Sequence, residues 1–179
     1  MALVEPFIFQ VVGYQNSGKT TISTKLIKTL TDRGIKTVTV KHHGHGGGKP
    51  DVIEQKDSSR HLSSGAIASI VEGSGRVILQ ADNLNLSLEE QIELLKFFQP
   101  DVVLIEGYKQ KNYPKLLLIR NKEDLPLLEV TTNICAVGYW SEELNTEYTY
   151  PAFSINEDAC VHWTAEFIQG NVHKKDEKS

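Results

Sequence analysis

The chain has 179 residues, of which 40% are hydrophobic and 23% charged, and this length and composition suit one globular domain with a sizeable core. Its formal net charge of −4 argues against the basic surface that nucleic acids or anionic membranes require, so we expect neither as a partner. No apolar run approaches the roughly 20 residues of a membrane span, and the first residues lack the basic head of a signal peptide. We therefore expect a cytoplasmic protein with a single domain over residues 1–172 and a disordered charged tail over residues 173–179.

An apolar run at Phe7–Val12 predicts a first strand, and a glycine-containing loop follows it directly. The spacing of Gly13, Gly18, Lys19 and Thr20 matches the pattern Gly-x-x-x-x-Gly-Lys-Thr, in which backbone amides and a helix N-terminus hold phosphate groups. In that pattern the lysine contacts the β- and γ-phosphates, and the threonine hydroxyl is a ligand of Mg²⁺. A plain turn is the alternative, but the predicted strand and helix supply the context that the phosphate pattern needs. The predicted phosphate-binding residues are Gly13, Asn16, Ser17, Gly18, Lys19, Thr20 and Thr21.

After a helix with one apolar face, the β-branched run Ile35–Val40 predicts a second strand, parallel to the first. This strand delivers Lys41 and His42 to the edge where ligands of open α/β sheets bind, and we expect both residues to contact a phosphorylated ligand. The three histidines His42, His43 and His45 also permit a metal site, although one loop cannot complete a preformed site by itself. A solvated loop without a ligand is the third interpretation.

The next segment combines a short polar helix with a hairpin. Residues 56–66 predict the helix, in which Asp57 is placed either to position Mg²⁺ or water or to cap the helix. Ile67–Val71 and Val77–Leu79 flank the glycine-rich stretch Glu72–Arg76 and predict a β-hairpin outside the parallel core. Because a lone two-stranded hairpin is only marginally stable in water, this hairpin either caps the domain or pairs across a dimer axis.

A capping box at Ser87 opens a further helix, and the continuous apolar run Asp101–Gly107 then predicts a strand that is buried on both faces. Glu106 ends this strand, where P-loop proteins place an acid that holds Mg²⁺ directly or through water, although aspartate is commoner there. A structural acid or a helix cap is the alternative. We predict Glu106 as a magnesium residue together with Thr20, and Lys19 and Glu106 as the residues of any catalysis.

The predicted strand Lys115–Arg120 delivers Asn121, Lys122 and Asp124, which match the Asn-Lys-x-Asp pattern of guanine-specific nucleotide proteins. A carboxylate at the last position accepts two hydrogen bonds from the N1–H and N2–H₂ edge of guanine, whereas adenine presents an acceptor at N1. We expect Asp124 to select the base, and Asn121 and Lys122 to brace the loop and cover the ring. Four polar residues after a strand also form ordinary turns, which is the alternative.

The remaining elements complete a doubly wound, mainly parallel α/β sheet of the P-loop NTPase type, with the β-hairpin as an addition. Ile134–Gly138 and Ala152–Ser154 predict strands, and Asn156 is expected to cap a closing helix that ends at Gly170. The two cysteines lack metal-like spacing, and we expect both to be buried free thiols: Cys135 and Cys160.

Four stretches of the chain occur in the same order in a known family. They are Gly13–Thr21, Val40–His43, Lys56–His61 with Gly65 and Ala66, and Glu106–Lys109. Together they resemble the molybdopterin-guanine dinucleotide biosynthesis adaptor family over residues 7–140, which is far more specific than the phosphate loop alone.

The resemblance implies a cytoplasmic, homodimeric protein that binds GTP and Mg²⁺. Its partners would be the guanylyltransferase that joins GMP to molybdopterin and other molybdopterin-handling enzymes, and its GTP hydrolysis would be slow at most. The phosphate and magnesium residues that carry over are Gly13, Gly18, Lys19, Thr20 and Thr21, with Glu106 as the acid.

The histidine loop is only loosely like that of the family, so two other functions remain open. One is a small-molecule kinase or ligase that holds an acceptor near the γ-phosphate with Lys41 and the histidines. The other is a metallocentre-assembly GTPase with its metal on His42, His43 and His45.

Overall fold

The computed structural model describes residues 5–42, 57–82, 84–144 and 148–176. The chain divides into two compact units. The first combines Met1–Gly44 with Gln91–Ser179 and contains the predicted phosphate loop, and the second is His45–Glu90, which contains the predicted hairpin.

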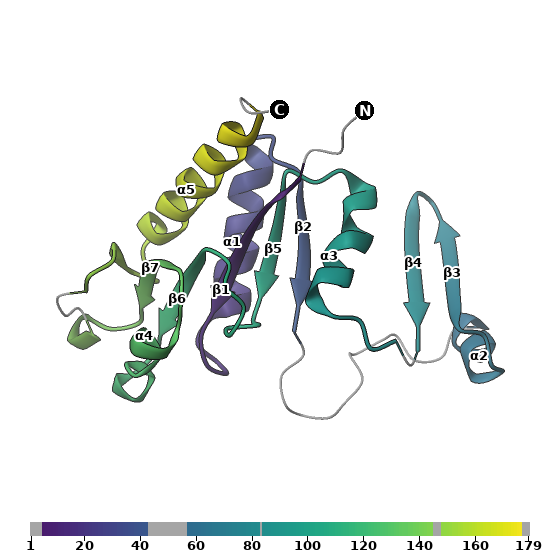
Figure 1. Cartoon of the computed structure of the whole chain (residues 1–179), viewed down its shortest axis with the longest axis horizontal. Coiled ribbons are helices and arrows are strands. Elements are labelled where there is room, and N and C mark those ends of the chain that lie inside the picture. The colour runs from purple at the N-terminus through teal and green to yellow at the C-terminus, as the bar shows by residue number, and fades with distance from the viewer. Residues whose placement is uncertain (1–4, 43–56, 83, 145–147, 177–179) are drawn as a thin grey trace. The chain divides into compact units, whose positions relative to one another are not determined.

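A parallel sheet forms the centre of the first unit (Figure 1). In the described part of the chain it has six strands in the order β2-β5-β1-β6-β7-β8, and every neighbouring pair runs parallel. This arrangement confirms the predicted doubly wound fold, with the hairpin as an addition. The strands are β1 (Phe7–Val12), β2 (Thr37–Lys41), β5 (Val102–Glu106), β6 (Lys115–Ile119), β7 (Ile134–Tyr139) and β8 (Ala152–Ser154).

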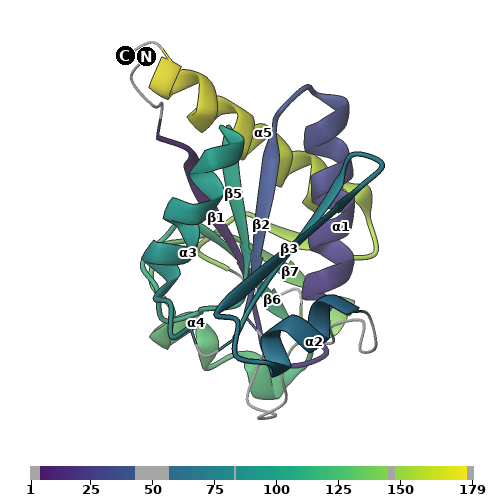
Figure 2. The ribbon, with the colours of Figure 1, turned by 90° about the vertical axis from the view of Figure 1, so that its right-hand side faces the viewer.

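Helices cover both faces of this sheet (Figure 2). On one face, α1 (Lys19–Asp32) and α5 (Asp158–Asp176) bury their apolar sides against alternate residues of β1, β5 and β6. On the other face, α4 (Leu127–Val130) packs against the remaining residues of β6 and β7. The central strands β1, β5, β6 and β7 are therefore mostly buried, which is why their sequences are nearly continuous apolar runs without the alternation of a half-exposed strand.

The register of the central strands decides what meets at the carboxyl edge of the sheet. Val11 of β1 and Lys41 of β2 both lie opposite Glu106 of β5. The loops that follow these three strands therefore begin side by side.

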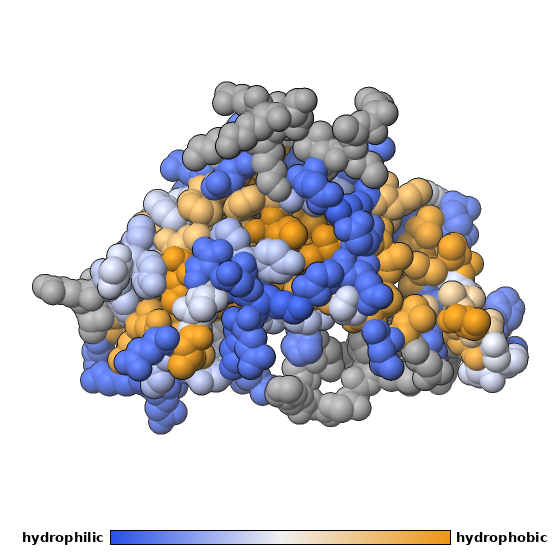
Figure 3. Space-filling model, in the orientation of Figure 1, coloured by the Kyte–Doolittle hydropathy of each residue, from blue (hydrophilic) through white to orange (hydrophobic). Residues whose placement is uncertain are grey.

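The second unit contains α2 (Asp57–Ser63) and an antiparallel hairpin of β3 (Ala68–Gly73) and β4 (Arg76–Ala81). Its two turn residues, Ser74 and Gly75, have φ of 53° and 77°, as the tight two-residue turn of a twisted hairpin requires. The large apolar side chains of the hairpin and its entry are exposed and colour this part of Figure 3 orange: Ile67, Ile70, Val71, Val77, Ile78 and Leu79.

The helix α3 (Leu88–Leu95) starts in the second unit and continues into the first. The predicted capping box opens it, because the Ser87 N–H donates to Glu90 Oε2 (2.8 Å) and the Glu90 N–H donates to Ser87 Oγ (3.2 Å). These two bonds satisfy backbone groups that a helix start otherwise leaves open.

The predicted end of the last helix at Gly170 is wrong, since α5 continues to Asp176. Val172, one turn beyond Ile168, still packs into the core, and this contact outweighs the weak helix preference of glycine. Both cysteines are free thiols as predicted, but only Cys160 is buried, and its burial raises the pKa of the thiol to about 11. None of the helices in the described ranges has the length and apolar character of a membrane span.

Candidate functional site

The loop between β1 and α1 is built around two glycines. A Cβ atom on Gly13 would lie 2.4 Å from Ser17 Oγ and 2.9 Å from the carbonyl oxygen of Leu118, so only glycine fits. Gly18 precedes α1 with φ of 87°, and Asn16 also adopts a left-handed conformation, with φ of 60°. The loop thus turns tightly into the N-terminus of α1, where backbone amides and the helix dipole favour an anion.

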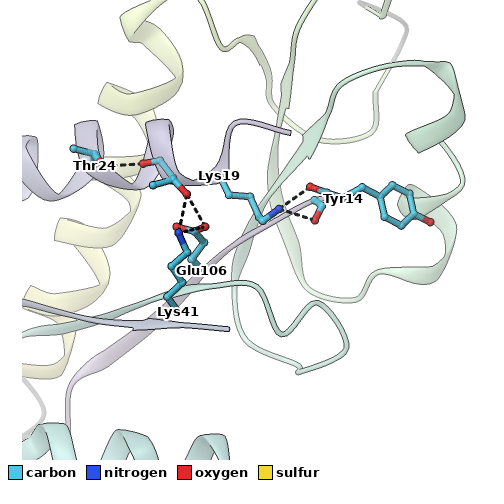
Figure 4. Close-up of polar contacts among 7 residues, drawn as sticks. Tyr14, Lys19, Thr24, Lys41 and Glu106 are labelled. Atoms are coloured by element: carbon cyan, nitrogen blue, oxygen red, sulfur yellow. Dashed lines mark hydrogen bonds and ion pairs between the residues drawn. The ribbon is translucent and has the colours of Figure 1, made fainter. Parts of the chain in front are cut away.

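Lys19 extends from the first turn of α1 across this loop (Figure 4). Its ammonium donates to the carbonyl oxygens of Gly13 (3.2 Å) and Tyr14 (2.6 Å). Burial lowers the pKa of Lys19, and the nearby charges of Lys109 and Lys41 lower it further, while the charges of Glu106 and Asp124 raise it. Lys19 is paired here with neutral carbonyl oxygens, and an anion bound at this loop would be a stronger, charged partner for its ammonium.

Thr20, Glu106 and Lys41 meet beside Lys19. The Thr20 hydroxyl donates to Glu106 Oε1 (2.8 Å), and Lys41 Nζ donates to Thr20 Oγ1 (3.2 Å). Lys41 Nζ also lies 3.4 Å from Glu106 Oε1 (Figure 4). The register of β1, β5 and β2 brings these three side chains together from α1, β5 and β2.

The chain that follows Glu106 folds back over the same edge. Gly107 has φ of 101°, and a Cβ atom there would lie 3.0 Å from the Cβ atom of His42. The Tyr108 ring lies 4.6 Å from the His42 ring, measured between centroids, and Lys109 Nζ lies 4.3 Å from the centroid of the Tyr14 ring. This segment thus links the end of β5 both to the phosphate loop and to the end of β2.

Buried polar side chains of the sheet hold this segment in place. Gln10 Nε2 donates to the carbonyl oxygens of Gly107 (3.0 Å) and Tyr108 (2.9 Å). Lys115, opposite Gln10 in the sheet, donates from Nζ to the carbonyl oxygen of Lys111 (2.5 Å), and burial lowers its pKa. The position of the loop after Glu106 therefore depends on two side chains from neighbouring strands.

The predicted guanine-binding tetrad lies after β6, the neighbour of β1 in the sheet. Asn121 and Lys122 are exposed, whereas Asp124 is buried, and its Oδ2 accepts a hydrogen bond from the Arg120 N–H (2.8 Å). Because β6 pairs in parallel with β1, the tetrad that follows β6 lies at the same edge of the sheet as the phosphate loop.

Of the remaining predicted site residues, only some are described, and His42 lies at this edge beside Tyr108. His42 is described and exposed, while His43 and His45 lie outside the described residues. Asp57 starts α2 in the second unit, and its side chain also lies outside the described part. The described ranges contain no group of three or more His, Cys, Asp or Glu residues arranged to hold a metal ion.

Trp140 is a site residue that the sequence reasoning missed. It follows β7, and its Nε1–H donates to the carbonyl oxygen of Ser17 (3.0 Å). A Cβ atom on Gly18 would lie 3.0 Å from Trp140 Cζ2, so the indole also packs against the loop. The sequence could have pointed to Trp140 because it directly follows a buried strand, and the residues that follow parallel strands all lie at the same edge of the sheet.

The donor set fits a Mg²⁺-bound nucleotide. Thr20 Oγ1 and the Glu106 carboxylate are the hard oxygen ligands that Mg²⁺ prefers. The glycine turn, the N-terminus of α1 and the Lys19 ammonium are the groups that bind phosphate oxygens in P-loops.

Comparisons with known proteins agree in fold and sequence. The family model described as MobB, molybdopterin guanine dinucleotide synthesis protein B, matches residues 8–140. A Bacillus subtilis (strain 168) protein named probable molybdopterin-guanine dinucleotide biosynthesis adapter protein is 40% identical over 172 residues, which are 95% of this chain and 98% of the relative.

Solved structures extend the likeness to three dimensions. The crystal structure of Bacillus subtilis MobB superposes with a TM-score of 0.78 at 38% identity and covers 89% of this chain and 96% of that one. The hydrogenase maturation factor HypB from Archaeoglobus fulgidus has a TM-score of 0.54 at 11% identity over 94% of this chain and 91% of its own, which shows a shared fold alone.

Proposed function

The chain belongs to the molybdopterin guanine dinucleotide synthesis protein B family, and from this membership and the site geometry we propose that it is a GTP- and Mg²⁺-binding adaptor in molybdopterin-guanine dinucleotide biosynthesis. The observation that carries the nucleotide proposal is the meeting of Lys19, Thr20 and Glu106 at the carboxyl edge of β1 and β5. This adaptor would assist the guanylyltransferase that joins GMP to molybdopterin.

Each residue of the loop has a separate task in this proposal. The amides of Gly13–Gly18 and the start of α1, including Thr21, bind phosphate oxygens, and Lys19 exchanges its carbonyl partners for the phosphate chain. Thr20 and Glu106 hold Mg²⁺, which supplies positive charge to the phosphates when bound. Trp140 fixes the loop from outside through the Ser17 carbonyl.

Calorimetry with GTP and Mg²⁺ tests the nucleotide proposal. We expect Lys19→Ala to weaken binding at least tenfold, because a hydrogen bond to a charged group contributes about 1.5–3 kcal/mol. Lys36→Ala is the matched control, since Lys36 is an exposed lysine that precedes β2, at the end of this strand opposite to the phosphate loop. Equal affinity of Lys19→Ala and the unchanged protein would refute the phosphate role of the loop.

Selection of guanine is assigned to Asp124, with Asn121 and Lys122 around the ring. Asp124→Asn is a sharper test than Asp124→Ala, because the amide oxygen can still accept the hydrogen bond from the Arg120 N–H. The amide NH₂ group is a donor and cannot accept a hydrogen bond from the N1–H or N2–H₂ group of guanine. We expect the preference for GTP over ATP to fall in this variant. If the unchanged protein binds ATP and GTP equally, the base assignment is wrong.

Fast turnover is not part of the proposed role. An arginine that stabilises the transition state raises GTP hydrolysis by a factor of about 10³–10⁵, whereas the cations whose charges act on Lys19 in the described part of the chain are the lysines Lys41 and Lys109. An adaptor needs a nucleotide-dependent bound state, so we expect slow hydrolysis at most. Single-turnover assays measure this rate directly.

We also infer a homodimer and a cytoplasmic location. The exposed apolar side chains of β3 and β4 are a large area for a monomer to leave in water, and an isolated hairpin is only marginally stable. Light scattering on the protein tests the dimer: Ile70→Asp, on a residue that is 68% exposed, should give monomers, whereas a dimer of unchanged strength would exclude the hairpin as the interface.

The partner assignment has its own test. Pulldown of the guanylyltransferase by the purified protein, with and without GTP and Mg²⁺, should show association in at least one of the two states. Association in neither state would refute the adaptor role while leaving nucleotide binding untouched.

A further inference from the structure

We propose that the Lys41 ammonium takes the place of Mg²⁺ when the metal is absent. It then contacts the Thr20 and Glu106 oxygens, and binding of Mg²⁺ releases it toward an anionic ligand. This inference rests on the proposed nucleotide function and adds to it an order of events. Magnesium and nucleotide bind first, and the anion that Lys41 contacts binds second.

The hydrogen bonds of the Thr20 hydroxyl show which oxygens Lys41 contacts in the absence of the metal. The Thr20 hydroxyl has one proton, which it donates to Glu106 Oε1 at 2.8 Å. Its oxygen accepts from Lys41 Nζ at 3.2 Å, and the same ammonium lies 3.4 Å from Glu106 Oε1. Lys41 therefore occupies one of the two lone pairs of Thr20 Oγ1 and lies against the carboxylate oxygen that a cation between these two groups would contact.

Two cations cannot share these oxygens. Mg²⁺ binds its oxygen ligands at about 2.0–2.1 Å, so a magnesium ion held by both Thr20 and Glu106 would need the space beside these oxygens in which the Lys41 ammonium lies. The ammonium and the ion also repel each other at this separation. Lys41 must leave Thr20 when the metal enters.

Lys41 is the partner that can move. Its side chain is 58% exposed, whereas that of Glu106 is 13% exposed at the end of a buried strand. Its backbone stays fixed, because Lys41 lies opposite Glu106 in the sheet and the His42 N–H donates to the Glu106 carbonyl oxygen (2.9 Å). Release is therefore a swing of one flexible side chain.

The released ammonium has an anion-binding neighbourhood. His42 is exposed beside it, and the Tyr108 ring lies 4.6 Å from the His42 ring. Lys109 is exposed on the same segment as Tyr108. Cationic and hydrogen-bonding side chains of this kind suit a phosphate-bearing ligand, and Lys41 joins them only after it leaves Thr20.

The test compares nucleotide affinity with and without magnesium. For each variant, the dissociation constant of GTP in EDTA is divided by that in saturating Mg²⁺, which gives the gain in affinity from the metal. We expect Lys41→Met to raise this ratio about two- to fivefold, because a partly exposed ion pair no longer opposes the metal. Lys41→Arg keeps a competing cation and should stay near the unchanged protein, as should Lys36→Met, a control at the opposite end of β2.

A second measurement follows the release itself. Lys41 acylation by an amine-reactive reagent is measured by peptide mass spectrometry with GTP in EDTA and with GTP in Mg²⁺. We expect labelling of Lys41 to be at least twice as fast with Mg²⁺, while labelling of Lys36 stays constant.

Each outcome decides a separate point. If Lys41→Met leaves the ratio unchanged or lowers it, or if Lys41 labelling does not rise with Mg²⁺, the exchange is refuted while the nucleotide proposal stands. If the unchanged protein binds GTP in neither condition, the proposed function is refuted and the exchange with it.

Discussion

Lys115 offers a direct test of how the loop after Glu106 is held. It begins β6 with 0% exposure, and burial lowers the pKa of its side chain. In an unfolded chain this pKa is about 10.4. The substitution Lys115→Met keeps an unbranched side chain of similar length and removes both the charge and the hydrogen bond to the Lys111 carbonyl oxygen.

The sign of the pH effect follows from proton counts. Below the folded-state pKa both states carry the proton on Lys115, and above about 10.4 neither does, so this residue adds no pH dependence there. Between these values the unfolded chain binds more protons than the folded protein. The free energy of unfolding of the unchanged protein therefore rises with pH in this window, by at most about 1.4 kcal/mol per pH unit, and Lys115→Met lacks this rise.

The effect at neutral pH is a balance of two terms. Removing a buried charge stabilises the variant, and leaving the Lys111 carbonyl oxygen without the Lys115 donor destabilises it by about 1–3 kcal/mol. The trend with pH is the more informative quantity, because it follows the titration of Lys115 once Cys135, which interacts with it, is removed from both proteins.

Urea unfolding between pH 7 and pH 10 measures this trend. Both proteins should carry Cys135→Ala, because the pKa of the Cys135 thiol is raised by burial and lowered by a backbone hydrogen bond of Lys115 and by the Lys115 charge, so the two side chains interact. Cys160 and Tyr139, whose pKa values are also raised by burial, are present in both proteins, so their contributions to the pH dependence cancel in the difference between the two unfolding free energies. A difference in unfolding free energy that stays constant over this range would refute the reasoning that Lys115 is buried and charged.

Three further predictions concern close contacts at and near the site. Gly13→Ala should abolish GTP binding in calorimetry, because its Cβ would lie 2.9 Å from the fixed backbone oxygen of Leu118; retained affinity would contradict the tight turn. Gly138→Ala in β7 should cost about 1–3 kcal/mol by overpacking against Leu118 Cδ2 (2.8 Å) and Ile155 Cγ2 (2.9 Å), with GTP affinity preserved; an unchanged melting temperature would show that this core has room. Trp140→Phe should lose the bond to the Ser17 carbonyl, worth about 0.5–1.5 kcal/mol, and with it any change of tryptophan fluorescence on GTP binding; a fluorescence change that survives would have to come from Trp163.

Local patterns in the chain were enough to predict most of the fold. The buried strands are continuous apolar runs, and the phosphate loop combines two glycines, a lysine and a threonine at a spacing that few other structures use. The hairpin was equally readable, because its glycine-rich turn separates two β-branched segments. The helix end at Gly170 was predicted wrongly, since a glycine signal is weak where an apolar residue one turn later still reaches the core.

Contacts between distant segments were decided by the tertiary structure. The sequence by itself determined that Glu106 ends a buried strand, and that Lys19 and Thr20 open the helix after the glycine loop that follows the first strand. The order β2-β5-β1 of the folded sheet then decided that Lys41 meets Thr20 and Glu106, and the pairing of β1 with β6 decided that Gln10 and Lys115 lie together. Strand order and register are set by packing over the whole sheet, so no local pattern of residues encodes which strand ends become neighbours.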